Sequence, residues 1–366
     1  MSNSARRVRY AVVGAGNIVQ VAVLPAFQHA RENSELVAVI SGDPAKRSAL
    51  RERYSLEADG DYGELEDILE RTRADAVYIA TPNSLHREYA VRAAARGVHV
   101  LCEKPLAPTV ADCEAIAATC REHSVKMMIA YRLHFEAANL RALEIVRSGQ
   151  LGRPRLFSSF FSHVVREGDI RLNGSLAGGA VYDLGVYCIN AARNLFQAEP
   201  VSVFAFAIHR GDTDDTTVAT MKFPDSRIAQ FSVSNSTADV SSYRIVGEKG
   251  DLRLEPAFEY AGENVHYLTV DGKTKREAFG KRDQFAPELL YFSNCILEDK
   301  EPEPSADEGT RDIRVIEAMQ KSIESGTQVA LLPLAERRAR PSMDQEMKKP
   351  AVGKQKPVNA PGPSAR

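Results

Sequence analysis

The chain has 366 residues, of which 44% are hydrophobic, and its formal net charge at pH 7 is only −2. This length is enough for two domains with cores of their own, and the near-neutral charge argues against a nucleic-acid-binding protein. No apolar stretch is long enough to span a membrane, and the first apolar run is broken at once by glycines, unlike a signal peptide. The five cysteines are odd in number and lack metal-ligand spacing, which is typical of reduced thiols in a cytoplasmic protein.

The first part of the chain, residues 1–130, alternates short apolar runs with helical patterns. Continuous apolar runs are typical of parallel strands covered on both faces, and helices between them indicate βαβ units. We therefore expect a doubly wound α/β domain. Pro25 is expected to kink or end its first helix, whereas Asp43 and Thr109 mark the starts of later ones. Strands are predicted at residues 8–13, 36–40, 76–80, 98–102 and 126–130.

The second part, residues 131–335, contains strand patterns separated by turn signals, which predicts an α+β domain with a largely antiparallel sheet. From residue 336 to 366 the chain is rich in Lys, Arg, Pro and Ala without periodicity, which predicts a disordered basic tail. Strands are predicted at residues 155–165, 201–209, 218–223, 228–233, 243–246, 252–254 and 266–270, and helices at 181–196, 287–298 and 309–325.

A glycine turn follows the first predicted strand. Gly14 permits a tight turn, and Gly16 permits the close approach of a pyrophosphate to backbone N–H groups at a helix start. Val19 stands where the full dinucleotide-binding fingerprint has its third glycine, so the fingerprint is incomplete. The turn alone is therefore weak support for a coenzyme site.

Several motifs in a fixed order make the pattern more specific. They are Gly14-x-Gly16-Asn17, Thr81-Pro82-Asn83-Ser84-Leu85-His86, Cys102-Glu103-Lys104-Pro105 and Asp183-x-Gly185-x-Tyr187. With these motifs the chain resembles, over roughly residues 6–333, the glucose-fructose oxidoreductase, inositol dehydrogenase and MocA family, and within it the aldose oxidoreductases. The resemblance implies a Rossmann domain for a nicotinamide coenzyme, and an open-faced sheet that binds substrate and commonly forms the interface of a homodimer or homotetramer.

The end of the second predicted strand bears on the choice of coenzyme. NAD enzymes usually carry an acid there that binds the ribose 2′-hydroxyl, but this chain has Ser41, followed by the cations Lys46 and Arg47. These residues favour the 2′-phosphate of NADP. Asp43 either caps the next helix or turns toward the ribose, which would favour NAD. The expected coenzyme contacts, partly on the family resemblance, are Gly14, Gly16, Asn17, Ile18, Ser41, Gly42, Lys46, Arg47, Tyr62, Thr81, Asn83, His86, Glu103, Lys104 and Arg132.

Lys104 is the first catalytic candidate, because it leaves the carboxyl end of a central strand where α/β sheets bind ligands. Pro105 restricts its backbone, and the resemblance implies a cis peptide bond. The alternative is a surface lysine paired with Glu103.

Asp183 and Tyr187 are four residues apart on a predicted helix and so project from one face. An unperturbed tyrosine has a pKa of about 10, and a lysine and the positive nicotinamide would both stabilise its phenolate. We expect Tyr187 to act with Lys104 as an acid/base pair, while Asp183 orients the substrate hydroxyl or the lysine. The alternative for Tyr187 is packing beneath a glycine pair. Arg171 resembles a substrate-binding arginine of the aldose enzymes, or else is a solvated charge.

These residues predict an oxidoreductase that oxidises the anomeric hydroxyl of an aldose to a lactone with NADP and without a metal, with a second sugar as oxidant if the coenzyme stays bound. Two alternatives remain open. One is oxidation at a ring hydroxyl of a sugar or cyclitol, or a dihydrodiol or xylose dehydrogenase activity. The other is a non-catalytic protein that binds sugar and NADP for regulation.

Overall fold

The computed structural model describes residues 6–335 and 341–364. The described residues form two compact units. The first unit comprises the chain up to Arg132 together with residues 282–310 and 347–363, and the second comprises the remainder. The sequence places 282–310 in the second domain and 347–363 in a separate tail, so the structure divides the chain differently there. The parts of the expected first domain and tail at 1–5, 336–340 and 365–366 lie outside the described residues.

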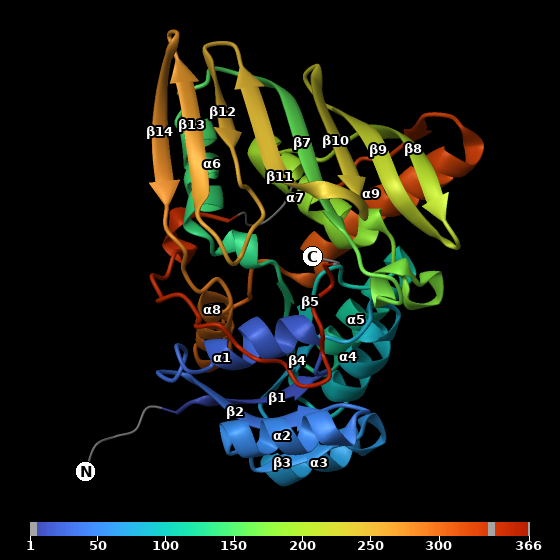
Figure 1. Cartoon of the computed structure of the whole chain (residues 1–366), viewed down its shortest axis with the longest axis vertical. Helices are drawn as coiled ribbons and strands as arrows, with labels where there is room; N and C mark the ends of the chain where they lie inside the picture. Colours follow the sequence, from blue (N-terminus) through green and yellow to red (C-terminus); the bar gives the residue numbers. More distant parts are fainter. Residues whose placement is uncertain (1–5, 336–340, 365–366) are drawn as a thin grey trace. The chain divides into compact units, whose positions relative to one another are not determined.

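The first unit is built on a six-stranded sheet. Its strands are β1 (Val8–Val13), β2 (Ser34–Ile40), β3 (Ala58–Gly60), β4 (Ala76–Ile79), β5 (His99–Glu103) and β6 (Met127–Ala130). Their order is β3-β2-β1-β4-β5-β6, and all neighbouring pairs are parallel, which confirms the predicted doubly wound domain (Figure 1). The prediction missed β3, because this short strand includes Asp59 and has no apolar run.

The helices of the first unit begin where the sequence indicates. Asp43 Oδ1 accepts hydrogen bonds from the N–H groups of Ala45 and Lys46 at 2.9 and 3.1 Å, so Asp43 caps α2. After the glycine turn, a π-helical turn, η1 (Val19–Val23), leads into α1, which ends at Ala26 next to Pro25 as expected. The helices are α1 (Leu24–Ala26), α2 (Pro44–Tyr54), α3 (Leu65–Thr72), α4 (His86–Ala94), α5 (Val110–Glu122) and α8 (Ala286–Leu297).

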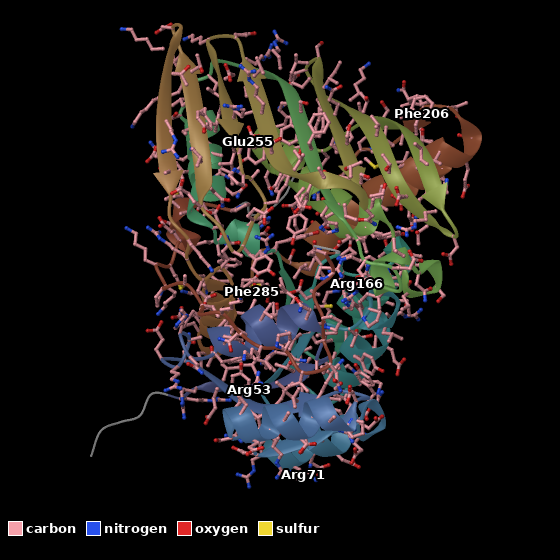
Figure 2. All side chains as sticks on the ribbon, in the orientation of Figure 1. Arg53, Arg71, Arg166, Phe206, Glu255 and Phe285 are labelled. Atoms are coloured by element: carbon pink, nitrogen blue, oxygen red, sulfur yellow. The ribbon has the colours of Figure 1, made fainter. Side chains whose placement is uncertain are left out.

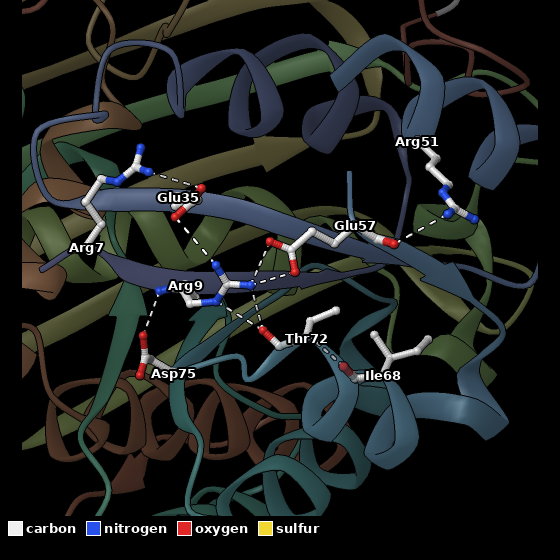
Figure 3. Close-up of polar contacts among 8 residues, drawn as sticks. All are labelled: Arg7, Arg9, Glu35, Arg51, Glu57, Ile68, Thr72 and Asp75. Atoms are coloured by element: carbon white, nitrogen blue, oxygen red, sulfur yellow. Dashed lines mark hydrogen bonds and ion pairs between the residues drawn. The ribbon is translucent and has the colours of Figure 1, made fainter. Parts of the chain in front are cut away.

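A polar cluster closes the amino-terminal edge of this sheet (Figure 3). The Arg9 guanidinium donates to Glu57 at 2.6 Å and to the Thr72 carbonyl at 2.8 Å, and lies 3.7 Å from Glu35. The hydrogen bond to Glu57 raises the pKa of Arg9 despite partial burial. Arg9 N–H also donates to Asp75 just before β4, so the cluster ties several strand starts together. The opposite, carboxyl edge remains for ligand binding, as is general for α/β sheets.

Helix α8 packs on β1 and β2, and this packing explains why residues 282–310 belong to the first unit. The hydroxyls of Tyr10 and Ser293 lie 2.8 Å apart in the core, and Asn33 donates to the Leu290 carbonyl at 2.9 Å. An apolar helix face in the sequence does not say which sheet it covers. The predicted boundary therefore missed the return of the chain.

The second unit contains a nine-stranded sheet in the order β14-β13-β12-β11-β7-β10-β9-β8-β15. All neighbouring pairs are antiparallel except β7 and β10, which confirms the predicted largely antiparallel sheet. The strands are β7 (Pro154–Val164), β8 (Ser202–Arg210), β9 (Thr213–Phe223), β10 (Arg227–Ser234), β11 (Ser236–Gly247), β12 (Gly250–Leu254), β13 (Asn264–Val270), β14 (Lys273–Phe279) and β15 (Val329–Ala330).

Helices cover one face of this sheet (Figure 1). The prediction missed α6, although its residues are largely apolar. It also missed β14, which is mostly polar, and β15, which has only two residues. The covering elements are α6 (Ala137–Arg147), the π-helical turn η7 (Val181–Gly185), α7 (Val186–Phe196) and α9 (Ala306–Ser325).

The other face of the sheet carries exposed apolar side chains. Phe206, labelled in Figure 2, is 64% exposed and pairs in register with Val218, and Leu156 pairs with Ile228. An exposed apolar patch of this kind marks an interaction surface. We call it the apolar sheet face: Leu156, Phe160, Phe206, Ile208, Val218, Ile228 and Val240.

Three further observations concern residues 6–335 and 341–364. None of the helices described there is both long enough and apolar enough to cross a membrane. In the same residues no cluster of three or more His, Cys, Asp and Glu side chains could hold a metal ion. All five cysteines are buried and free of disulfides.

Candidate active site

The glycine turn lies at the carboxyl edge of the parallel sheet, between β1 and η1. Gly14 has φ +103°, and a Cβ there would stand 2.4 Å from the Ala80 carbonyl oxygen, so only glycine fits. Gly16 is exposed, and a Cβ on it would meet no atom within 4 Å among the described residues. Asn17 and Ile18 follow, half-buried, at the start of η1. The turn therefore presents open backbone of the kind a pyrophosphate needs.

The end of β2 gathers the residues expected to select the coenzyme. Ser41 is 4% exposed and hydrogen-bonds to the hydroxyl of Tyr62, whose ring lies 3.4 Å from the Cβ position of Gly42. Burial raises the pKa of Tyr62, so it is a neutral phenol at pH 7. Arg47 donates to the Ser41 carbonyl at 3.1 Å, and Lys46 lies beside it in the first turn of α2. The end of β2 therefore joins a serine, an aromatic ring and the Arg47 cation, which is itself paired with Asp61 at 3.3 Å.

Asp43 does not share that role, because its Oδ1 caps α2. The hydrogen bond from the N–H of Lys46 is the main reason why the pKa of Asp43 is lowered, so the carboxylate is charged at neutral pH. Of the two alternatives for Asp43, the structure has the helix cap.

His86, expected near the coenzyme, is completely buried. Its Nδ1 lies 3.0 Å from the Pro105 carbonyl and its Nε2 3.0 Å from the Thr81 carbonyl. Burial lowers the pKa of His86, so its ring is neutral and donates to one of these carbonyls. His86 ties the loop after β4 to the loop after β5 and so positions Lys104. Thr81 is itself buried and Asn83 is half-buried at the same loop.

Lys104 leaves the end of β5, and its peptide bond to Pro105 is cis, as the family resemblance implies. Its N–H donates to Glu103 Oε2 at 3.3 Å, and the Tyr78 hydroxyl donates to Glu103 Oε1 at 2.7 Å. Burial raises the pKa of Glu103, while the charge of Lys104 lowers it. Lys104 as a whole is half-buried.

A second group of buried polar residues interacts electrostatically with Glu103. Arg132 is 6% exposed and donates to Gln284 Oε1 at 2.5 Å. Glu288 is completely buried, and neither of its carboxyl oxygens has a hydrogen-bond partner in the described structure. Burial and the neighbouring charge of Glu103 raise the pKa of Glu288 well above its usual range. Sequence reasoning missed Gln284 and Glu288, because both lie in the segment it assigned to the other domain.

In the second unit, Asp183 lies on η7 and is held by Arg171. The Arg171 Nε donates to Asp183 Oδ2 at 2.7 Å, and Nη1 donates to Asp169 Oδ1 at 3.1 Å. Burial opposes the charge of Arg171, but the two carboxylates outweigh it and raise the pKa. Arg171 is therefore a paired cation rather than a solvated charge. His163 Nε2 lies 3.9 Å from the same Asp183 oxygen.

Two glycines bring the Arg171 loop against η7. A Cβ on Gly178 would stand 2.6 Å from the Arg171 carbonyl oxygen, and Gly179 has φ +118°. Asp214 Oδ2 accepts from the Val181 N–H at 2.9 Å and so caps η7. Asp214 lies in β9 and so positions the π-helical turn that carries Asp183.

Tyr187 stands one turn after Asp183, at the start of α7. Its ring centroid is 5.5 Å from that of Phe161 and 5.9 Å from that of Phe258, and the side chain is half-buried. These contacts fix the ring plane without enclosing the residue. Packing and a chemical role are thus compatible for Tyr187.

Each unit by itself assembles part of the predicted site. The first unit brings together Ser41, Gly42, Arg47 and Tyr62, and separately links His86 to the loop of Lys104. The second unit joins Arg171 to Asp183.

Comparison with known proteins agrees with this reading of the two units. Residues 8–131 match the model of an oxidoreductase family with an NAD-binding Rossmann fold, and residues 139–253 match the GFO/IDH/MocA C-terminal domain. A D-xylose 1-dehydrogenase [NADP(+)] of Haloarcula marismortui is 31% identical over 88% of this chain and 93% of its own. A D-xylose 1-dehydrogenase (NADP(+)) of Haloferax volcanii is 32% identical over 88% and 99%.

Solved structures give the same result. The aldose-aldose oxidoreductase of Caulobacter crescentus, complexed with glycerol, has a TM-score of 0.85 and 36% identity over 89% of this chain and 100% of its own. The 3-ketoreductase KijD10 of Actinomadura kijaniata, in complex with NADP and TDP-benzene, has a TM-score of 0.79 and 26% identity over 86% and 98%. The chain belongs to the GFO/IDH/MocA family of oxidoreductases.

Proposed function

We propose that this protein transfers hydride between the anomeric carbon of an aldose and NADP, giving an aldonolactone. The observation that carries the proposal is the set of groups at the end of β2, where Ser41, Tyr62 and Arg47 replace the acid of NAD enzymes. The relatives named above act on sugars, and several carry NADP in their names or complexes.

The coenzyme is NADP, and the first unit offers a fitting set of donors for it. The open backbone at Gly16 suits the pyrophosphate, and Arg47 with Ser41 suits the 2′-phosphate. Asp43 is engaged in capping α2 and does not compete with the phosphate. When bound, the nicotinamide accepts or delivers the hydride.

The remaining chemistry falls to the chain's own residues. We assign to Lys104 the polarisation of the reacting sugar oxygen, and to Tyr187 the removal of its proton, as an acid/base pair. The cation of Lys104 stabilises the phenolate that Tyr187 becomes in this step. The support is chemical: Lys104 is half-buried at a strand end, and packing fixes the Tyr187 ring.

Asp183 and Arg171 bind and orient the sugar. Arg171 fixes Asp183 Oδ2, and we assign Asp183 the role of accepting a hydrogen bond from a sugar hydroxyl. Arg171 retains donors for a second hydroxyl. This pair would set which sugar carbon faces the coenzyme.

A second sugar can serve as the oxidant if NADPH stays bound between half-reactions. The relative named aldose-aldose oxidoreductase supports this finer reading. The alternative is reaction at a ring carbon, and the 3-ketoreductase KijD10 is the observation that favours it. A non-catalytic sugar-binding role is the less supported alternative, since Lys104, Asp183 and Tyr187 are all present.

We further propose a homodimer or homotetramer formed through the apolar sheet face, because so many exposed apolar side chains favour self-association. The five buried free cysteines support a cytoplasmic location.

The test is an absorbance assay at the NADPH band with a panel of aldoses, beginning with D-xylose and D-glucose, and with NADP or NAD as acceptor. We expect lactone formation with NADP and weaker activity with NAD. Analysis of the product identifies the oxidised carbon, and a keto sugar in place of a lactone would favour the ring-carbon alternative. Absence of turnover with every sugar, despite bound coenzyme, would exclude the enzyme.

A further inference from the structure

The C-terminal tail contacts the helix that follows the glycine turn, although its composition predicts disorder. Asn17 Nδ2 donates to the Ala360 carbonyl at 2.8 Å. The Gln20 amide pairs with the backbone of Val358 in both directions, donating to its carbonyl at 2.9 Å and accepting from its N–H at 2.7 Å. Gln20 is completely buried and Ala360 is 6% exposed. The tail is therefore held on this surface by buried hydrogen bonds.

The same segment reaches the other end of the coenzyme site. Asn359 Nδ2 donates to Asp43 Oδ2 at 3.2 Å, and Arg53 Nη1 donates to the Lys356 carbonyl at 3.1 Å. Asp43 follows the phosphate-selecting Ser41 by two residues. Residues 356–362, which we call the strap, thus extend from the glycine turn to the end of β2. These are the two places where a dinucleotide's pyrophosphate and adenosine ribose bind in Rossmann domains.

The strap covers the site without filling it. Its hydrogen bonds go to the side chains of Asn17 and Gln20, which follow the glycine turn, and of Asp43, which caps α2. A Cβ on Gly16 would meet no described atom within 4 Å, so the strap leaves the space beside that glycine open. Lys354 and Lys356, just before and at the start of the strap, make this part of the tail positively charged.

We propose that the strap closes over bound NADP(H) and slows its release. The proposal rests on the NADP site argued above. It also answers the question that the proposed function leaves open, because a sugar can reoxidise NADPH in place only if the coenzyme remains bound after the first sugar product leaves. Retention is thus a property of residues 356–362 in addition to the glycine turn.

The test compares four proteins. Three have the full length, namely the wild type, Val358→Pro and Ala351→Pro, and the fourth is a shortened chain that ends after Glu346. Val358→Pro removes the backbone N–H that donates a hydrogen bond to Gln20 Oε1. Ala351→Pro places a proline at an exposed tail position outside the strap and serves as the matched control. Each protein is loaded with NADPH, and the loss of its bound-state fluorescence is followed after addition of excess NADP. Thermal unfolding without coenzyme checks that each variant folds.

We expect NADPH release to be about tenfold faster from the shortened chain and from Val358→Pro, and within about twofold of wild type for Ala351→Pro. In the wild type, NADPH should also protect the chain from trypsin at the exposed Lys354, two residues before the strap.

Unchanged release from both strap variants would overturn the proposal. Slower release, or cleavage at Lys354 that NADPH accelerates, would overturn it as well, because the tail would then compete with the coenzyme. If the wild type binds no NADPH, the proposed function fails together with the strap. If the wild type binds NADPH but the strap variants release it at the wild-type rate, only the strap proposal is rejected.

Discussion

Arg171 and Asp183 form an ion pair in the second unit, with 2.7 Å between Arg171 Nε and Asp183 Oδ2. Arg171 also donates to Asp169, so its planar guanidinium is held at two points. Two glycines that admit no side chain bring its loop to η7. A carboxylate fixed in this way is suited to hold a sugar hydroxyl in one orientation.

Replacing Arg171 by lysine should lower sugar kcat/KM by about tenfold or more, because a single ammonium cannot hold both carboxylates. The dissociation constant of NADPH should stay within about twofold, since Arg171 lies in the second unit and the coenzyme contacts lie in the first. Steady-state kinetics and a coenzyme titration check both values. The control is Arg210→Lys, in an exposed ion pair with Glu167. Equal losses in the two variants would contradict a positioning role.

Ser41→Asp should weaken NADP binding, because a carboxylate there repels the 2′-phosphate. The cost is about 2 kcal/mol or more, on the order of 30-fold in Kd, with NAD affected less. Titrations of both coenzymes measure the ratio. Asp43→Asn is the control, since asparagine also caps helices but carries no charge. If Asp43→Asn changed the ratio of NADP to NAD affinity instead, Asp43 rather than Ser41 would determine which coenzyme ribose is bound.

The buried Glu288 predicts a pH-dependent gain in stability for Glu288→Gln. Its pKa in the folded protein is raised well above the ordinary 4.5. Above that ordinary value the unfolded chain loses a proton that the folded chain keeps, so the wild type loses up to about 1.4 kcal/mol per pH unit until the folded pKa is passed. Glutamine does not titrate.

In thermal unfolding, the stability of the Glu288→Gln variant relative to the wild type should therefore increase as the pH rises from 5 to 8. Exposed Glu70→Gln in α3 is the control and should show no such trend. A constant difference across this pH range would mean that Glu288 is ionised in the folded protein.

The apolar sheet face predicts that Phe206→Asp shifts the protein to smaller oligomers. Phe206 is 64% exposed in β8, and a charge buried in an interface is costly. Light scattering after size-exclusion chromatography measures the mass. Leu297→Asp, at an exposed position on α8, should leave the mass unchanged. A wild type that is already monomeric would exclude this interface.

The sequence was informative wherever local chemistry decides structure. Asp43 capped its helix, Pro25 limited the first helix, and the apolar runs became parallel strands, because each depends on neighbouring residues. Ser41 also lies where strand-end reasoning put it, next to Arg47.

Long-range packing was beyond such reasoning. Nothing local to the α8 segment indicates that Ser293 meets Tyr10, or that Val358 in a basic tail meets Gln20. His86 illustrates the same limit within a motif: its position near the coenzyme loops was expected, but its burial between two carbonyls was not. These contacts join residues far apart in the chain, and only the folded structure brings them together.

The central claim is that Tyr187 removes the proton of the reacting sugar hydroxyl while the Lys104 cation stabilises the resulting phenolate. Single-turnover reduction of bound NADP by the preferred aldose tests it most directly, with wild type, Tyr187→Phe, Lys104→Met and the control Tyr267→Phe, whose ring lies on β13 under Arg253. We predict a rate at least about 100-fold lower for Tyr187→Phe and Lys104→Met, with NADP still bound, and an unchanged rate for Tyr267→Phe. A Tyr187→Phe rate within about threefold of wild type would contradict the account.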